Sequence, residues 1–175
     1  LTDLVVVTAP VVMQLYAFFE EGRMDANSFI TAVGLLESYV FRRSICDMQT
    51  RGLGNIMSTL VHKLRAEDPL GSLKVALQMR GDAQRFPDDD EFRLALETRD
   101  LYHTDNCAIL LDRLENHGSR ELVNTKAYTI EHIMPQNEAL HKEWQDMLGA
   151  DWKNVQKTWL HRLGNLTLTG YNSTY

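Results

Sequence analysis

The sequence has neither a cysteine framework nor a membrane-spanning run. Its two cysteines, Cys46 and Cys107, lie far apart and form no CxxC pair, which favours reduced thiols in a cytosolic protein. The most apolar stretch, residues 4–12, is shorter than the roughly 20 residues that cross a bilayer, and it contains Pro10. It also lacks the basic leader and the small-residue cleavage site of a signal peptide. We therefore expect a cytoplasmic protein with no membrane partner.

An excess of basic residues is also lacking. The 175 residues include 18 Lys and Arg against 24 Asp and Glu, a net charge of −6. The imbalance falls in residues 1–125, whereas residues 126–175 hold five basic and five acidic side chains. A protein that grips nucleic acid mainly by neutralising phosphates is basic somewhere. The composition therefore disfavours strong DNA binding by this chain alone. It indicates that another domain provides most of the DNA-binding surface.

A glycine-rich phosphate loop is missing as well. None of the ten glycines falls in a Walker-type motif, so we expect no nucleotide site in this chain. The sequence does not begin with Met, and it stops after residues 172–175 without a helix-ending signal. These features indicate a piece of a longer protein.

Helical patterns occupy the first 120 residues. Apolar side chains recur at helical spacing in residues 25–43, 55–64 and 72–79, and each stripe predicts one buried face. Several short helices joined by short connections are typical of an α-helical bundle. We expect this helical domain to cover residues 1–122.

Two charged motifs in the helical region have competing interpretations. Asp88, followed three residues later by Glu91, is typical of a capping box at a helix start. We prefer this reading to a metal-binding acidic cluster, because acidic side chains also complement the positive end of the helix dipole. Arg42 and Arg43 could bind DNA or pair with acidic neighbours, and the pattern does not choose between them.

Residues 123–175 predict a small α+β unit. Residues 127–130 contain Tyr, Thr and Ile, and residues 166–169 alternate Leu and Thr within a segment bounded by Gly164 and Gly170, so both runs suit strands. Helical patterns fill the interval between them, the first with Asn137 as its expected cap.

All three tryptophans, Trp144, Trp152 and Trp159, lie between the two predicted strands. Their neighbours are at helical spacing, so we expect the tryptophans to build the small core of this unit. A role in stacking on nucleic-acid bases is the less favoured alternative.

The run Glu-His-Ile-Met-Pro at residues 131–135 could carry chemistry. His132 follows a strand and precedes a proline, which places it on a rigid turn. A neutral imidazole with a pKa near neutrality is suited to take a proton from water. Taken alone, however, His132 is better explained as a structural histidine with a satisfied ring.

A second motif follows the helical interval. Asn165 begins the second strand, and Asn172 follows seven residues later. An Asn oxygen can bind a hard divalent cation without adding charge, and an Asn amide can also bridge backbone groups across a tight turn. The order of strand and His, long insertion, Asn and strand, then Asn is that of a ββα-metal (HNH) finger.

Residues 128–136 and 164–172 together resemble the HNH nuclease domain of GmrSD-type, modification-dependent restriction proteins. The segment Leu-Leu-Glu-Ser-Tyr-Val-Phe-Arg-Arg at residues 35–43 is similar to the part of that family that joins an N-terminal nucleotide-hydrolysing domain to the nuclease. The resemblance implies a mainly α fold: a helical bundle followed by a small α+β HNH finger with a helical insertion. This nuclease domain would cover residues 123–175, with its final helix truncated. It also implies DNA, possibly modified, and the nucleotide-hydrolysing domain as partners.

The resemblance implies a role for each matched residue. His132 would be the general base that activates water, and Asn165 would orient the loop that bears it. Glu131 and Asn172 would be ligands of Mg²⁺ or Mn²⁺, which would offset charge that develops in the transition state. Because the chain ends soon after Asn172, the helix that normally helps to fix this ligand is cut short, and the chain as it stands could be inactive.

Other histidines allow weaker interpretations. His161 and Arg162 could contact phosphate or form a solvated helix end. His132, His141 and His161 lie in one region, but no Cys is near them and no His pair has a short ligand spacing, so we disfavour structural zinc.

The sequence favours a metal-dependent endonuclease module that hydrolyses DNA phosphodiester bonds in a restriction or phage-defence protein. One alternative is a non-catalytic helical module that binds DNA or a partner through a degenerate HNH scaffold. Another is an RNA-cleaving toxin with the same finger. The matched set Glu131, His132, Asn165 and Asn172 favours the enzyme over the scaffold.

Overall fold

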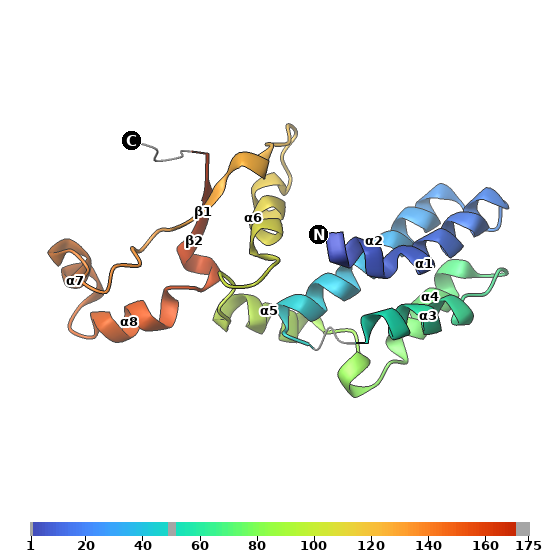
Figure 1. Ribbon diagram of the computed structural model, residues 1–175, viewed down its shortest axis with the longest axis horizontal. Coiled ribbons are helices and arrows are strands. Elements are labelled where there is room, and N and C mark those ends of the chain that lie inside the picture. Colours follow the sequence, from blue (N-terminus) through green and yellow to red (C-terminus); the bar gives the residue numbers. More distant parts are fainter. Residues whose placement is uncertain (1, 49–51, 171–175) are drawn as a thin grey trace. The chain divides into compact units, whose positions relative to one another are not determined.

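The structure, a computed structural model, describes residues 2–48 and 52–170 and divides into two compact units, Leu1–Phe92 and Arg93–Tyr175 (Figure 1). Both units are built mainly of helices, and the second contains a two-stranded antiparallel sheet. The predicted fold class is thereby confirmed. The predicted start of a nuclease domain at residue 123 stays a prediction. Within the two described ranges, no helix is both long enough and apolar enough to cross a bilayer.

The first unit is a helical bundle around an apolar core. Its elements are α1 Thr2–Glu20, α2 Ala26–Ile45, α3 Leu53–Lys63, α4 Pro69–Gln78, the 3-10 turn η1 Asp82–Gln84 and the start of α5 Asp89–Thr98. The helix α1 packs against α2 and α3, and α4 packs against the same two helices. Apolar side chains from all four helices meet in the core, among them Leu15, Leu36, Tyr39, Met57, Leu60, Leu73 and Leu77.

Aspartate caps begin three of these helices. Asp25, Asp68 and Asp88 each accept a hydrogen bond from the backbone N–H three residues further on, at 2.8, 2.9 and 2.8 Å. Such caps satisfy N–H groups that have no partner inside the helix. The predicted helix start at Asp88 is confirmed, but the side chain of Glu91 forms an ion pair with Arg85 instead of closing a capping box.

Arg42 and Arg43 have structural roles in the first unit. Arg42 forms an ion pair with Asp89, and its guanidinium lies over the Phe92 ring, 5.0 Å from the ring centre. Arg43 is buried and donates a hydrogen bond to the carbonyl of Arg85 at 3.2 Å. Of the two interpretations left open by the sequence, pairing with neighbouring groups describes Arg42.

The second unit places a helical insertion between its two strands. Its elements after α5 are α6 Cys107–Asn116, η2 Thr125–Ala127, β1 Thr129–His132, α7 Lys142–Leu148, α8 Trp152–Trp159, η3 Leu163–Asn165 and β2 Leu166–Thr169. The helix α6 packs against β2, and α7 packs against α8. Buried Cys107, Leu111 and Leu166 form a small core with Tyr102, Ile130, Leu163 and Leu168.

Two expectations for the second unit are wrong. The tryptophans do not build its core: Trp144 and Trp152 are only half-buried, and Trp159 is 46% exposed. The core forms instead where α6 covers the sheet, because β2 supplies the apolar face. Asn137 does not cap a helix, since α7 begins only at Lys142, and its side chain accepts a hydrogen bond from Ala139 N–H in the preceding loop.

Candidate active site

His132 is the last residue of β1 and lies on the covered face of the sheet. The antiparallel register pairs it with Leu166 and pairs Glu131 with Thr167. Successive residues of a strand point to opposite faces. His132 therefore shares the face of Leu166, which α6 covers, whereas Glu131 is exposed on the other face. The strand thus separates a half-buried imidazole from a solvated carboxylate.

Two aromatic rings, those of Tyr102 and His161, fix the position of the His132 imidazole. His132 Nε2 and His161 Nδ1 share a hydrogen bond at 3.2 Å. The Tyr102 ring presents an edge-to-face contact to His132 at 4.4 Å between ring centres and stacks on His161 at 5.4 Å. His132 is therefore held between the loop that precedes α6 and the segment that follows α8.

Asn165 ties the turn after His132 to the rest of the unit. Its Oδ1 accepts the Met134 N–H at 2.6 Å, and its Nδ2 donates to the carbonyls of Met134 and Leu160 at 3.2 and 2.9 Å. Its own carbonyl accepts the Ile133 N–H at 2.9 Å. Asn165 is buried, and an amide is the side chain that can donate and accept here at once without charge.

Gln156 of α8 holds the next part of the same loop, at Pro135 and Asn137. Its Nε2 donates to the carbonyls of Pro135 and Asn137, both at 2.9 Å, and the side chain is buried. The sequence analysis missed this residue. A polar residue next to the apolar stripe of α8 is a signal that could have found it.

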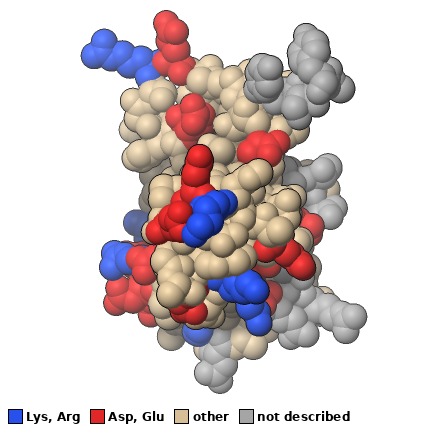
Figure 2. All heavy atoms as spheres, turned by 90° about the vertical axis from the view of Figure 1, so that its left-hand side faces the viewer, with Lys and Arg blue, Asp and Glu red and all other residues tan. Residues whose placement is uncertain are grey.

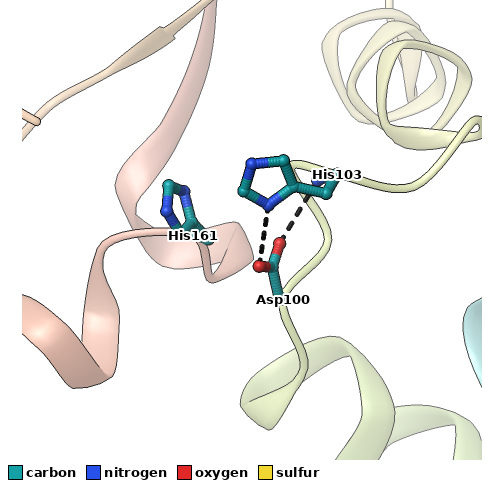
Figure 3. Close-up of side chains that lie close together, drawn as sticks. All are labelled: Asp100, His103 and His161. Atoms are coloured by element: carbon teal, nitrogen blue, oxygen red, sulfur yellow. Dashed lines mark hydrogen bonds and ion pairs between the residues drawn. The ribbon is translucent and has the colours of Figure 1, made fainter.

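The loop between α5 and α6 brings two further groups to the site. The backbone N–H groups of Leu101 and Tyr102 donate to the His161 carbonyl at 2.9 and 3.3 Å. In the same loop, His103 Nδ1 lies 2.8 Å from Asp100 Oδ2. Figure 3 shows Asp100 and His103 facing His161 from this loop. One oxygen and two nitrogens of these three side chains lie within 4.8 Å of one another, so this group could hold a metal ion.

Burial sets the protonation of the imidazole. It lowers the pKa of His132 below the ordinary value of about 6.5, and the nearby His161 lowers the pKa further, against the opposing effect of Glu131. His132 is therefore neutral at pH 7, the form that accepts a proton. Partial burial alone would raise the pKa of Asp100, but the hydrogen bonds from His103 outweigh it and lower that pKa.

A cavity of about 380 Å³ opens beside His161. Its lining includes Asp100, His161, Lys157 and Arg162. The Arg162 guanidinium lies over the Trp159 ring, 4.8 Å from the ring centre. Two cationic side chains on this wall could attract a phosphate, although Figure 2 shows acidic and basic side chains interspersed on the face that it presents.

The structure brings some of the predicted site residues together and not others. His132 and His161 share a hydrogen bond, Asn165 bonds the neighbouring Met134 and Leu160, and Arg162 lines the cavity beside His161. The Glu131 side chain leaves the strand on the opposite face, and Asn172 lies outside the described residues. Sequence analysis also missed the contributions of Asp100, Tyr102 and His103, because they depend on a loop that meets His161 only in the fold.

The fold and site together define a mainly helical protein whose small antiparallel sheet presents a neutral histidine beside a buried asparagine. Residues 86–175 match the family model of the C-terminal domain of GmrSD restriction endonucleases, and the chain belongs to this family. The resemblance predicted from the sequence is confirmed, and the chain is a restriction endonuclease module whose family acts on DNA. No curated protein and no solved structure matches the chain.

Proposed function

We propose that this chain is the HNH-type catalytic module of its restriction endonuclease and that His132 is the general base for phosphodiester hydrolysis. The proposal rests on the surroundings of His132. Its side chain is half-buried and its pKa is lowered. It lies at the end of a strand, and Asn165 holds the turn that follows it. A general base must combine a free lone pair with a fixed position. His132 Nε2 is engaged with His161 Nδ1, and His132 Nδ1 has no hydrogen-bond partner among the described residues, so Nδ1 would hold the lone pair that takes the proton.

The described residues supply part of a site for a hard divalent cation. Glu131 is an exposed carboxylate, and among the described residues it makes no ion pair that would occupy its oxygens. Such oxygens suit Mg²⁺ or Mn²⁺, which commonly keep several waters and need few protein ligands. Glu131 and Asn172 would hold the ion. When bound, it would offset the negative charge that develops on the phosphate and the leaving oxygen.

The chain's own residues would then have separate roles in catalysis and DNA binding. His132 would take a proton from the attacking water, while Asn165 holds the turn that carries the imidazole. His161 would orient the His132 ring through the bond between Nδ1 and Nε2. Lys157 and Arg162, which line the cavity beside His161, would contact DNA phosphate.

The test is a nicking assay on plasmid DNA with Mg²⁺ or Mn²⁺. We expect His132→Ala to lose activity by about 10²–10⁴-fold, the usual contribution of a general base. His141→Ala serves as the matched control, because His141 is also a histidine of the second unit but is exposed. A His132→Ala variant that cuts at the parental rate would refute the assignment.

A further inference from the structure

A second potential ligand group lies beside the catalytic histidine. Asp100 and His103 belong to the loop between α5 and α6, and His161 follows α8 (Figure 3). One ligand atom from each lies within 4.8 Å of the other two. None of these atoms belongs to Glu131, His132 or an asparagine, so the group is separate from the proposed magnesium ligands.

Main-chain hydrogen bonds already bring the three residues together. The His161 carbonyl accepts the N–H groups of Leu101 and Tyr102, and the His103 N–H donates to Asp100 Oδ1 at 3.2 Å. The Tyr102 ring stacks on the His161 ring with an interplanar angle of 17°. The backbone positions of all three donors are therefore set without a ligand, which reduces the ordering that binding requires.

The donor set suits a transition metal better than magnesium. Imidazole nitrogens and one carboxylate oxygen are ligands of Zn²⁺ at about 2.0–2.2 Å, whereas Mg²⁺ prefers an all-oxygen shell. We propose that Asp100, His103 and His161 form a binding site for Zn²⁺. No sequence pattern predicts this site, because its histidines are not closely spaced and no cysteine adjoins them.

Small side-chain rotations bring the donors into range. Tetrahedral ligands at the zinc distance lie about 3.3 Å apart, so the separations of up to 4.8 Å must shorten. The side chains of His103 and Asp100 are 63% and 49% exposed and can turn without disturbing the core. Their mutual hydrogen bond gives way to metal bonds, and Asp100 is already ionised as a ligand must be.

Three protein ligands leave a fourth coordination position. Zinc sites of this composition keep that position for water or another small ligand, whereas structural zinc sites are closed by four protein ligands. Two of the three ligands, Asp100 and His161, line the cavity of about 380 Å³, which also presents Lys157 and Arg162. A bound Zn²⁺ would therefore remain accessible to water or to an anion in this cavity.

Zinc binding would also fix the tautomer of His161. Its Nδ1 faces His132 Nε2, so Nε2 is the nitrogen left for the metal. A metal on one imidazole nitrogen leaves the proton on the other. His161 would then donate its Nδ1–H to His132 Nε2, which places the proton of a neutral His132 on Nδ1, so bound Zn²⁺ would hold the proposed base in a form that does not accept a proton from water.

The test is a Zn²⁺ titration of the 175-residue chain, measured by isothermal titration calorimetry at about neutral pH. Metal is first removed from the chain with a chelator. We expect one Zn²⁺ per chain. Loss of an outer-shell partner already lowers metal affinity by about 10–100-fold, so the loss of a ligand in His103→Ala should lower it by more than about 100-fold. His117→Ala is the matched control, because His117 is also exposed and lies at the end of α6, and it should bind like the parent.

The proposal would be overturned by a parent chain that takes up no Zn²⁺ or by a His103→Ala variant with parental affinity. Thermal unfolding of each variant shows that it folds, and Asp100→Asn, which alters an exposed side chain without changing its shape, tests the site a second time. X-ray absorption of the zinc-loaded chain should show two imidazole ligands, and a shell without imidazole would also refute the site. His132→Ala should still bind Zn²⁺, so failure of the nuclease assignment and failure of the zinc site give different results.

Discussion

His132 Nε2 lies 3.2 Å from His161 Nδ1, and this contact joins the end of β1 to the segment that follows α8. Whichever of these two nitrogens carries a hydrogen donates the hydrogen bond, and the other accepts it. Since Tyr102 packs against both rings, neither imidazole can turn without losing contact with the tyrosine. The position of the proposed base therefore depends on a residue far from it in the sequence.

Replacing His161 should impair the orientation of His132 more than the binding of DNA. His161→Phe keeps a ring to stack on Tyr102 but removes the hydrogen bond to His132. A net hydrogen bond is worth about 1 kcal/mol, so we expect kcat for nicking to fall by about fivefold, with a smaller change in KM. Single-turnover nicking of plasmid DNA measures the chemical step.

A conservative variant separates positioning from mere packing. His161→Gln retains a donor and an acceptor near the position of Nδ1 and should recover part of the kcat lost in His161→Phe. Equal kcat values for His161→Phe and the parent would show that the contact with His132 does not orient the base.

Asn165 should contribute strongly to stability. Asn165→Ala leaves the Met134 N–H and the Leu160 carbonyl without their side-chain partner in a buried turn. An unsatisfied buried group costs about 1–3 kcal/mol, so we expect the free energy of unfolding to fall by about 2–4 kcal/mol. Chemical denaturation monitored by circular dichroism measures this change.

Asn154→Ala is the matched control for that measurement. Asn154 is an exposed asparagine of the same unit, and its amide donates to Asp151 at 3.1 Å. We expect its free energy of unfolding to change by less than about 0.5 kcal/mol. If Asn165→Ala were as stable as this control, the three side-chain bonds of Asn165 would not hold the turn.

Local and long-range features differ in how far the sequence predicts them. The cap at Asp88 was found from the sequence because a cap involves residues three apart, and the strand–insertion–strand order was found because each element has its own pattern. The cluster of Asp100, Tyr102, His103 and His161 was not found, since a loop after α5 must first meet the end of α8. The prediction of a tryptophan core was wrong for a related reason. The tryptophans do lie in helices, but the core forms where α6 covers β2.

Cys107 should resist alkylation in the folded chain. Burial, followed by the charge of Asp100, raises the pKa of the Cys107 thiol to about 11. Thiolate is the reactive form, so iodoacetamide at about pH 8 should label Cys107 slowly until denaturant is added. Mass spectrometry of the labelled peptides measures the two rates, and equal labelling with and without denaturant would contradict the buried position.

The raised pKa of the Cys107 thiol also predicts how the free energy of unfolding depends on pH. The folded pKa of about 11 lies above the unfolded value, which is about 8.5. The contribution of the neutral thiol is therefore fully present below about pH 8.5 and is lost as pH rises toward 11. Cys107→Ala should lose less stability than the parent between these pH values.

Glu131 should affect metal dependence without affecting stability. Its carboxylate is exposed, so Glu131→Gln should change the free energy of unfolding by less than about 0.5 kcal/mol. If Glu131 holds the catalytic Mg²⁺, the amide should raise the Mg²⁺ concentration for half-maximal nicking by at least about tenfold. Nicking rates measured over a Mg²⁺ series give this concentration directly. Glu138→Gln alters an exposed glutamate in the loop after β1 and should match the parent, whereas a Glu131→Gln variant with the parental Mg²⁺ dependence would exclude Glu131 as the ligand.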